Sequence, residues 1–537
     1  MTGNRVASVG RRVAPRVLLA SMLALCGVLG PVAAAEAATA FPAVDSAEAS
    51  GGSTYSTTVH VPDGTALAVD VYQPAGPGPH PLLVIPGAWW AMPLDTIIDR
   101  HRELARAGYL VVAYDPRGLR RSGGEIDMTG PADVSDASEV ISWALAHTRA
   151  DPDRIGMLSS SYGAALSLNA AAHDARIKAV AALCPWTDLA GSFYPGNTPA
   201  GTMVTFQEVI GRLNGRLSPA TRDAMARIRS GEDIAAVRDW TTQRSPASFV
   251  PELNAHQTAV FMAGEWSDPL VPAGQSGHFL DALTGPRQLW MSPGGHGDSS
   301  AREADLLQPE ARVWEHATDW LDHFLRGRPN GAQALGPVLM RPRDDDRLES
   351  YPTWAALDLA LRAVQLEPAL PGADSVRLVA GADSPADSGL FPAAGRLDTV
   401  GLPPTTVLPL LVPPLAAVWQ SRPLDTPWAL RGSPRLHTTV TGSADHGTFV
   451  SYLYDVDPLG TARLLSHTPY SFYGQPAGRP LPVDVVLPAT AWTIRPGHRL
   501  ALVIDTADHR YADENPLGAT LDFDTSGTRL TAPARTG

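Results

Sequence analysis

Short apolar runs alternate with amphipathic stretches between about residues 54 and 325. Nearly continuous apolar runs are typical of strands buried on both faces of a parallel sheet, and the stretches between them have the period of a helix. Strands are predicted over Leu67–Tyr72, Leu82–Ile85, Leu110–Tyr114, Ile155–Leu158, Ala179–Leu183, Ala259–Ala263 and Gln288–Met291. Helices are predicted over Asp95–Arg106, Ala132–His147, Tyr162–Ala172, Gln275–Leu283 and Gln308–Leu325. The alternation predicts an α/β domain, which we place at residues 41–330.

One stretch interrupts this alternation. From Thr187 to about Leu253 there is no clear strand, but helical patterns occur at Val204–Leu213 and Pro219–Ile228. Because the stretch lies between two predicted sheet strands, we expect residues 187–253 to form a helical cap over the sheet edge where ligands bind.

The pattern changes after Pro329. The remaining chain is rich in proline and turn residues, with short alternating runs such as Thr448–Tyr454 and Leu500–Ile504. Helical periodicity is largely absent, which predicts an all-β sandwich over residues 331–537.

The first forty residues have the order of a secretory signal. Four arginines come first, at Arg5, Arg11, Arg12 and Arg16. A short apolar core, Val17–Val32, and small residues up to Ala40 follow, with A-x-A-like cleavage sites ending at Ala37 and at Ala40. We therefore expect residues 1–40 to be a signal peptide and the mature protein to be secreted. The stretch Leu23–Cys26 is similar to a lipoprotein box, which leaves lipid anchoring as a minor alternative.

Composition narrows the classes of partner and cofactor. The formal net charge is −13, and an acidic surface repels phosphate backbones, so nucleic acid is not an expected partner. No later segment approaches the roughly 20 uninterrupted apolar residues of a membrane-spanning helix. No metal-ligand spacing, dinucleotide fingerprint or phosphate loop occurs, so no metal and no cofactor are predicted. The sequence predicts no particular oligomeric state.

The two cysteines play no predicted catalytic part. Cys26 lies inside the expected signal, so the mature chain keeps only Cys184 and forms no intramolecular disulfide. Cys184 follows a predicted strand, which favours a buried, inert thiol.

The strongest chemical signal is the segment from Ile155 to Leu166. A predicted strand, a group of small residues and a predicted helix surround Ser161, and Ser159-x-Ser161-x-Gly163 takes the place of G-x-S-x-G. Small neighbours two residues either side of the serine let strand and helix approach closely, as a nucleophile elbow requires. The alternative is an ordinary serine-rich turn between a strand and a helix.

A serine nucleophile needs a base and an acid, which in this fold follow it in the order acid, then histidine. Asp268 comes after the strand Ala259–Ala263, and His296 lies in a glycine-rich loop after Gln288–Met291. Asp268 would fix the tautomer of His296 and stabilise its charged form. Glu265 and Asp298 are the nearest rival carboxylates, and a turn-initiating Asp before Pro is the structural alternative for Asp268.

The tetrahedral intermediate needs hydrogen-bond donors. The backbone N–H of Tyr162 is the first expected donor, and the second is expected after the strand Leu82–Ile85, at Ala88 or, as runner-up, at Trp89. Trp89, Trp90 and Trp266 are candidates for the substrate pocket, although the first two can equally pack under the cap.

With these residues together, the chain resembles the X-Pro dipeptidyl-peptidase and cocaine-esterase family of α/β-hydrolases. The matching stretches are Val61–Thr65, Asp70–Pro74, Ala107–Tyr109, Asp115–Gly118 with Ser122 and Gly124, Gly156-Met157, Ser161-Tyr162 and Arg244–Pro246. Further along, Asp455–Gly460, Trp492 and Arg495–Leu500 are similar to that family's C-terminal jelly-roll module. The resemblance implies an α/β-hydrolase with a helical cap, followed by a jelly-roll sandwich.

One position departs from the family pattern. The family usually has Pro-Tyr after the second predicted strand, and the tyrosine hydroxyl helps to bind the oxyanion. Here Gly87 follows Pro86, which favours a backbone donor at Ala88 and weakens the transfer of substrate preference.

Three hypotheses for function follow. The first is hydrolysis of a carboxylic ester through an acyl-enzyme on Ser161. The second is peptide or amide cleavage, including X-Pro dipeptidyl release, for which Glu265 or Asp188 could hold the substrate's amino terminus. The third is a catalytically inactive surface protein that binds through its β-sandwich.

Overall fold

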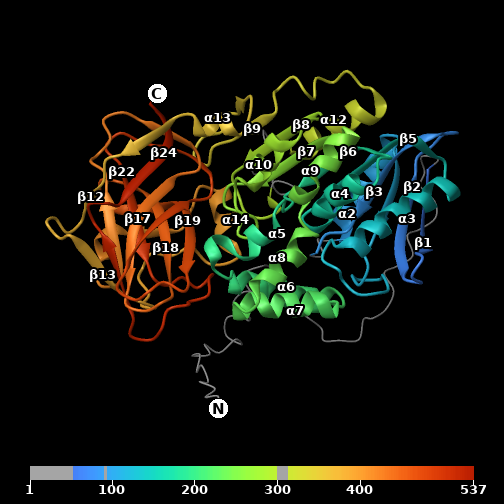
Figure 1. The fold of residues 1–537 in the computed structure, drawn as a ribbon. Helices are drawn as coiled ribbons and strands as arrows, with labels where there is room; N and C mark the ends of the chain where they lie inside the picture. The colour runs from blue at the N-terminus through green and yellow to red at the C-terminus, as the bar shows by residue number, and fades with distance from the viewer. Residues whose placement is uncertain (1–51, 90–93, 299–312, 537) are drawn as a thin grey trace, which may run out of the picture.

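The computed structural model describes residues 52–89, 94–298 and 313–536, and it divides into an α/β domain and a β-sandwich. Figure 1 shows the two parts side by side, with the helices α6 (Gly201–Asn214) and α7 (Pro219–Ser230) along the lower edge of the α/β domain. The α/β-hydrolase fold with a second, all-β domain is confirmed. The expected signal peptide lies outside the described residues.

A sheet of ten strands forms the centre of the α/β domain, within the part of the chain that is described. In spatial order its strands are β1 (Ser53–His60), β2 (Ala66–Gln73), β4 (Leu110–Tyr114), β3 (His80–Pro86), β5 (Ala150–Ser160), β6 (Ile177–Leu183), β7 (Ala259–Glu265), β8 (Arg287–Ser292), β9 (Val338–Met340) and β10 (Glu349–Tyr351). From β4 to β9 neighbouring strands are parallel, and β1, β2 and β10 pair antiparallel at the edges. All seven predicted strands fall inside observed ones.

Alternating side chains of the strands pack against helices on both faces. In β3, Leu82 and Val84 point into one core and Leu83 and Ile85 into the other. The first core contains side chains of α3 (Pro131–His147), α4 (Tyr162–His173) and α10 (Gln275–Ala282). The second contains side chains of α2 (Leu94–Arg106) and α12 (Val313–Arg326). Burial on both faces explains why the strands are almost entirely apolar.

The sheet continues beyond residue 330, the end of the α/β domain that the sequence predicts. The strands β9 and β10 are its last two, and β9 pairs parallel with β8. Each has only three residues, too few for a pattern of apolar positions to reveal its partner. The pairing therefore depends on where the chain returns after α12.

The segment between β6 and β7 is helical. It contains α5 (Leu189–Phe193), η1 (Pro195–Asn197), α6 (Gly201–Asn214), α7 (Pro219–Ser230), α8 (Ile234–Thr242), η2 (Pro246–Phe249) and α9 (Val250–His256). The two patterns predicted from sequence correspond to α6 and α7. The apolar side chains of this cap share a core with Trp89 and Tyr162, next to the end of β5.

The second domain consists mainly of two antiparallel sheets. One contains β11 (Leu361–Val364), β13 (Ser375–Val379), β16 (Trp428–Gly432), β17 (Arg435–Gly442), β20 (Pro480–Val486), β21 (Thr490–Ile494), β23 (Thr520–Asp524) and β24 (Arg529–Thr536). The other contains β12 (Glu367–Pro368), β14 (Thr405–Val407), β15 (Ala416–Gln420), β18 (Gly447–Val456), β19 (Thr461–Phe472) and β22 (Arg499–Asp505). The short helices α13 (Ala355–Asp358), α14 (Ala393–Thr399) and η4 (Leu408–Leu410) lie in its connections.

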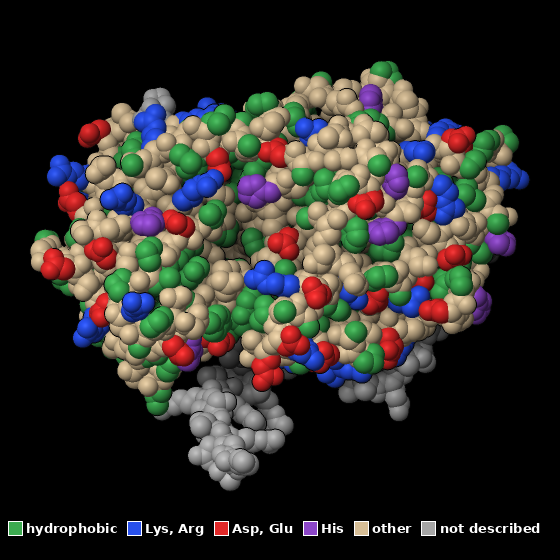
Figure 2. Space-filling view, in the orientation of Figure 1, with side chains coloured by type: hydrophobic (Ala, Val, Ile, Leu, Met, Phe, Trp, Pro, Cys, Tyr) green, Lys and Arg blue, Asp and Glu red, His purple; other side chains and the backbone are tan. Residues whose placement is uncertain are grey.

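The sandwich packs tightly on the α/β domain. The Trp354 ring lies 6.2 Å from that of Trp266, and the N–H of Ala489 donates to the carbonyl of Ala273 at 3.0 Å. The short helix α14 lies between the two domains (Figure 1). Figure 2 shows acidic and basic side chains interspersed over one face of both domains. Within the described ranges, no helix has the length and apolar character needed to span a membrane.

Candidate active site

Ser161 occupies the sharp turn between β5 and α4. Its backbone has φ 56° and ψ −121°, a conformation that is strained for a residue with a side chain. A Cβ at Gly163 would overlap both the Ser159 hydroxyl and the carbonyl of Pro86, so only glycine fits there. The Ser159 hydroxyl donates to the Pro86 carbonyl at 2.6 Å, which ties β5 to β3. The turn therefore presents Ser161 at the N-terminal end of α4.

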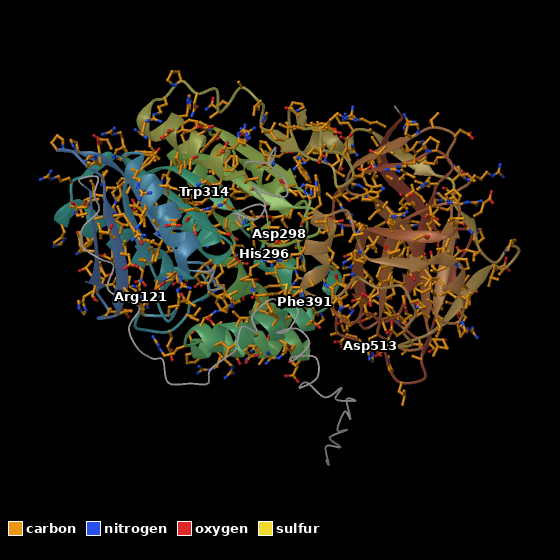
Figure 3. The ribbon with its side chains drawn as sticks, turned by 180° about the vertical axis from the view of Figure 1, so that it is seen from behind. Arg121, His296, Asp298, Trp314, Phe391 and Asp513 are labelled. Atoms are coloured by element: carbon orange, nitrogen blue, oxygen red, sulfur yellow. The ribbon has the colours of Figure 1, made fainter. Side chains whose placement is uncertain are left out.

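His296 contacts Ser161 directly. Its Nε2 lies 2.7 Å from Ser161 Oγ, and its Nδ1 lies 2.7 Å from Asp268 Oδ2. The histidine side chain is 16% exposed, so a reactant can reach it, whereas that of Asp268 is only 3% exposed. Figure 3 shows His296 near the middle of the molecule, where the α/β domain faces the sandwich. The structure thus brings together three residues that are far apart in the chain.

Asp268 is held from both of its oxygens. While Oδ2 accepts from His296, Oδ1 accepts the backbone N–H groups of Leu270 at 2.7 Å and Val271 at 3.0 Å. These bonds fix the carboxylate and leave the histidine Nδ1 as a donor, so Nε2 is free to accept the serine proton.

The rival carboxylates lie elsewhere. Glu265 is buried at the end of β7. Asp298 accepts from the N–H of Gly295 at 2.8 Å and lies 3.2 Å from Arg396 Nε. Neither is bonded to the histidine Nδ1 in the described part of the chain.

Burial and nearby carboxylates shift the pKa of His296 in opposite directions. Burial, the largest single influence, lowers its pKa, but the charge and hydrogen bond of Asp268 and the charges of Glu265 and Asp298 together outweigh burial. The net result is a raised pKa. This arrangement stabilises the imidazolium that forms when the histidine takes a proton.

The position of the two expected oxyanion donors is set by different contacts. The Tyr162 N–H is in the first turn of α4, where helix amides point toward an anion. The phenol of Tyr162 is fully buried and donates to Asp133 at 2.7 Å, so only the backbone of this residue can serve. The N–H of Ala88 has no bonding partner among the described residues, whereas that of Gly87 donates to the Tyr114 carbonyl.

The guanidinium of Arg120 lies directly against Gly87. A Cβ there would overlap the guanidinium Nη2 of Arg120. Nη1 of Arg120 donates to the Ala88 carbonyl at 2.9 Å, and its Nε donates to Asp115 at 2.7 Å. Arg120 therefore holds the peptide between Ala88 and Trp89, which adjoins the peptide that carries the Ala88 N–H. Nothing in the local sequence distinguishes Arg120 from the arginine that follows it, so its role becomes visible only in the folded chain.

The tryptophan candidates differ in position. Trp89 is buried, its indole N–H donates to the Gln207 carbonyl of α6 at 3.2 Å, and its ring lies 5.4 Å from that of Tyr162. It packs under the cap, which is the structural alternative considered above. Trp90 lies outside the described residues. Trp266 is buried, donates to the Arg341 carbonyl and lines a cavity between the domains.

This cavity has a volume of about 390 Å³ and reaches Asp268 from the side of the sandwich. Ser161 and His296 are not among its lining residues. The cavity therefore lies behind the loop that carries Asp268, separate from the face of His296 that contacts the serine. No cluster of residues suited to hold a metal ion occurs in the described ranges.

Helix α14 packs against the loop that carries Asp268 and the loop that carries His296. Gly395 packs against Gly295, beside His296, and the Ser267 hydroxyl donates to Asp398 at 2.6 Å. Thr399 donates to Asp298, in the histidine loop, at 3.3 Å. Thr399 and Asp398 lie 101 positions beyond Asp298 and 131 positions beyond Ser267, respectively, and no sequence signal pointed to them.

Two family models match the chain. The model for the X-Pro dipeptidyl-peptidase (S15 family) covers residues 63–298, and that for the X-Pro dipeptidyl-peptidase C-terminal non-catalytic domain covers residues 413–536. The resemblance predicted from sequence motifs is confirmed.

Among curated proteins, cocaine esterase of Rhodococcus sp. (strain MB1 Bresler) is 36% identical over 103 residues, which are 19% of this chain and 18% of that protein. A putative Xaa-Pro dipeptidyl-peptidase of Streptomyces avermitilis is 24% identical over 249 residues, covering 42% of this chain and 35% of that one. The matches thus span well under half the length of these relatives.

Solved structures share the whole fold. An aminopeptidase from a marine sediment archaeon, Thaumarchaeota archaeon, has a TM-score of 0.70 at 16% identity, covering 94% of this chain and all of that one. An α-amino acid ester hydrolase has a TM-score of 0.67 at 18% identity, with the same coverage. At these identities the likeness establishes the fold alone.

Proposed function

We propose that this chain, a serine hydrolase that belongs to the X-Pro dipeptidyl-peptidase (S15) family, cleaves carboxylic esters through an acyl-enzyme on Ser161. The observation that carries the proposal is the unbroken line of hydrogen bonds from Asp268 through His296 to Ser161, both links 2.7 Å long. Such a line activates a hydroxyl that is otherwise a poor nucleophile.

In the first half of the reaction, Ser161 Oγ attacks the ester carbonyl carbon as its proton passes to His296 Nε2. The oxygen of the carbonyl becomes an oxyanion and accepts from the backbone N–H groups of Tyr162 and Ala88. His296 then gives its proton to the departing alkoxide, the carbon–oxygen bond to the alcohol breaks, and the acyl group stays on the serine.

In the second half, water takes the place of the alcohol. His296 removes a proton from the water as its oxygen attacks the acyl carbon, and a second oxyanion forms at the same donors. Collapse returns the proton to Ser161 and releases the carboxylic acid. Asp268 does not take up the proton at any step and stabilises the charged imidazole.

Peptide cleavage after an X-Pro unit is the second candidate, because the matching family model carries that description. A dipeptidase needs an anion that faces the substrate's amino terminus. Glu265 is buried at 1% exposure, and Asp188 lines the cavity that does not include Ser161. These positions favour an ester substrate over a dipeptide.

Two assays test the proposal. A fluorophosphonate probe is expected to label the wild-type chain and not Ser161→Ala; labelling that survives the substitution contradicts the assignment of the nucleophile. An unlabelled wild type would favour a binding protein. With activity established, we expect p-nitrophenyl butyrate to turn over faster than Gly-Pro-p-nitroanilide, and the reverse order would favour the peptidase.

The proposal includes export of the mature protein. It rests on the arginines, apolar core and small residues within positions 1–40. Expression of the whole chain is expected to give a mature form in the medium that begins after Ala37 or Ala40. Retention of an uncleaved form inside the cell would contradict it.

A further inference from the structure

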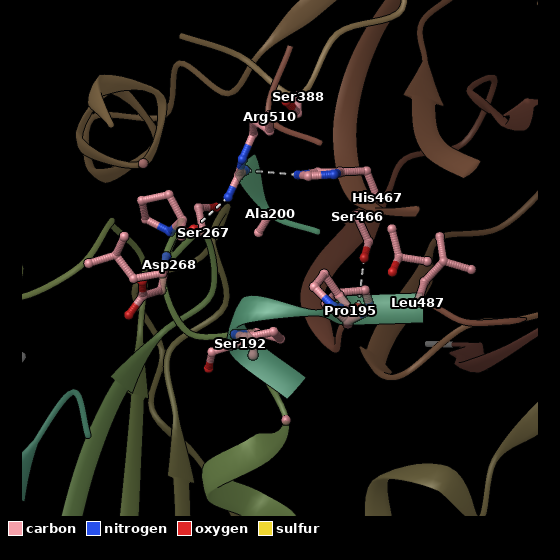
Figure 4. Close-up of a pocket in the computed structure, with 18 of the residues that line it drawn as sticks. Ser192, Pro195, Ala200, Ser267, Asp268, Ser388, Ser466, His467, Leu487 and Arg510 are labelled. Atoms are coloured by element: carbon pink, nitrogen blue, oxygen red, sulfur yellow. Dashed lines mark hydrogen bonds between the residues drawn. The ribbon is translucent and has the colours of Figure 1, made fainter. Parts of the chain in front are cut away.

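The cavity behind the acid loop is built from three parts of the chain. Pro195 and Ala200 come from the cap, Asp268 from the loop after β7, and Phe391 and Leu487 from the sandwich domain. Figure 4 shows Pro195, Asp268 and Leu487 around a common space, with Arg510 and His467 on one side. Its volume of about 390 Å³ is within the range of small-molecule sites, which are mostly apolar with a few fixed polar groups.

Two arginines line this cavity, and only one is neutralised. Arg343 is buried and forms a two-pronged ion pair with Asp398, at 2.8 and 2.9 Å. Arg510 is partly buried, and no carboxylate of the described residues forms an ion pair with its guanidinium within 4.0 Å. A cation with this burial and no counter-charge is a natural partner for an anionic ligand.

Neutral groups hold the Arg510 side chain in place. Its Nη2 donates to the Pro269 carbonyl at 2.6 Å, and its Nη1 lies 3.1 Å from His467 Nε2. Burial, together with the charge of Arg510, lowers the pKa of His467 to about 3, so the imidazole is neutral. Its Nε2 therefore accepts, and its Nδ1–H faces the Tyr511 hydroxyl at 3.1 Å. The guanidinium is thus fixed but keeps its charge and further N–H donors.

The carboxylates nearby are occupied by other donors. Asp508 accepts from the Ser388 hydroxyl at 2.9 Å, the Tyr452 hydroxyl at 2.8 Å and the backbone N–H of Arg510 itself at 2.8 Å. Asp268 is bonded to His296, and Asp188 accepts from the N–H of Gly191 at the start of α5. These carboxylates lower the positive electrostatic potential in the cavity, but they do not form an ion pair with the Arg510 guanidinium.

We propose that this cavity binds a small organic carboxylate, whose carboxylate oxygens accept from Arg510 and whose apolar body contacts Phe391 and Leu487. A planar guanidinium suits two parallel hydrogen bonds to a carboxylate. The cavity volume suits an acid of the size of phenylacetate. The ligand can be the acid released by the chain's own reaction or an unrelated acid from the surroundings, and the inference does not depend on the function of Ser161.

The test is calorimetric titration of the full chain with phenylacetate and with its neutral counterpart phenylacetamide. We expect phenylacetate to bind and the amide to bind at least about 10-fold more weakly, since a hydrogen-bonded charge is lost. Arg510→Gln is expected to weaken phenylacetate by about 10-fold to 100-fold. Arg377→Gln is the matched control, because Arg377 pairs with Asp522 on the outer strands β13 and β23, and we expect no change there.

Reaction of Ser161 with a fluorophosphonate before titration separates the cavity from the nucleophile. Binding that persists supports the cavity, and binding that disappears places the acid at the serine and overturns the inference. Three other results would also overturn the inference: equal affinity for phenylacetate and phenylacetamide, undiminished binding of phenylacetate by Arg510→Gln, or no binding of phenylacetate to the wild-type chain. If Arg510→Gln does not fold, Arg510→Lys keeps the charge without the two-pronged geometry, and a smaller loss is expected.

Two further comparisons of binding affinity identify the source of the ligand. If the cavity serves the chain's own product, the acid of the fastest ester substrate binds tighter than other acids of equal size. If it serves an outside acid, another member of a carboxylate panel binds tighter. If the fluorophosphonate does not react, the proposed function fails, while titration of the unblocked chain still decides on the cavity.

Discussion

Replacing Gly395 by alanine is predicted to slow catalysis from a domain that contributes none of the three proposed catalytic residues. A Cβ at this position would lie 2.5 Å from the Cα of Gly295 and 2.7 Å from the carbonyl oxygen of Ser267, where ordinary contact begins at 3.4 Å. These are backbone atoms, which cannot rotate away. The loops must therefore move apart from α14 by about 0.9 Å.

The displaced residues are direct neighbours of His296 and Asp268. A shift of this size would lengthen the 2.7 Å hydrogen bond between His296 and Ser161 to about 3.6 Å, beyond the range of a normal bond. Misplacement by about 1 Å can cost about 100-fold in rate. We therefore expect kcat to fall by about 100-fold, or about 2.7 kcal/mol of transition-state stabilisation, with little change in KM.

The fold is expected to survive the substitution. Gly395 lies inside a helix and not at a positive φ, so alanine gains about 1 kcal/mol of helix propensity. This gain offsets part of the roughly 1–3 kcal/mol that overpacking costs. Loss of activity should therefore appear without loss of cooperative unfolding.

The assay is steady-state hydrolysis of p-nitrophenyl butyrate, together with the rate of fluorophosphonate labelling and a thermal unfolding curve. Gly201→Ala is the matched control, because a methyl group there meets no atom within 4 Å. A kcat for Gly395→Ala equal to that of Gly201→Ala would refute the reasoning. So would a loss of activity that only follows unfolding.

Three other predictions concern the site itself. Asp268→Asn should lower kcat by roughly 10,000-fold, because an amide facing Nδ1 favours the wrong tautomer of His296; a loss under about tenfold, measured with p-nitrophenyl butyrate, would exclude Asp268 as the orienting acid. The acidic limb of the pH profile of kcat/KM should lie above pH 6.5, since the pKa of His296 is raised and only the neutral imidazole accepts a proton; a limb below that value would contradict the assignment. Arg120→Gln should lower kcat by up to about 100-fold at unchanged KM, because it releases the Ala88–Trp89 peptide, which adjoins the expected donor, the Ala88 N–H. Arg121→Gln should not, because Arg121 bonds Asp115 and Asp70 and not the Ala88 carbonyl; equal effects of the two substitutions would exclude a role of Arg120 at the oxyanion site.

The local pattern of apolar and polar residues was sufficient to predict the strands of much of the α/β domain. Each strand from β2 to β8 could be recognised from four to six adjacent residues, because burial on both faces leaves a nearly continuous apolar run in the inner strands and burial on one face leaves an alternating pattern in β2. The turn at Ser161 was equally readable, since the close approach of strand and helix demands small residues at fixed distances from the serine. The order of Ser161, Asp268 and His296 then followed from which strand each residue comes after.

Other features required the folded chain. The strand β9 has three residues and is defined by its partner β8, so its own sequence carries little information. The space beside Gly87 is filled by Arg120, 33 positions later, a contact that neither stretch of sequence indicates by itself. Similarly, Gly395 and Gly295 are each unremarkable alone.

The sequence by itself therefore determined most elements of the α/β domain, their order and the residue types at the proposed site, because hydrophobic period and turn chemistry act between near neighbours in the chain. Only the tertiary structure decided which distant segments touch: α14 against the histidine loop, Arg120 against the Ala88 carbonyl, and Arg510 against the Pro269 carbonyl at the cavity wall. Those contacts depend on how two domains pack, and packing is settled by the shapes of whole surfaces that no short stretch of sequence contains.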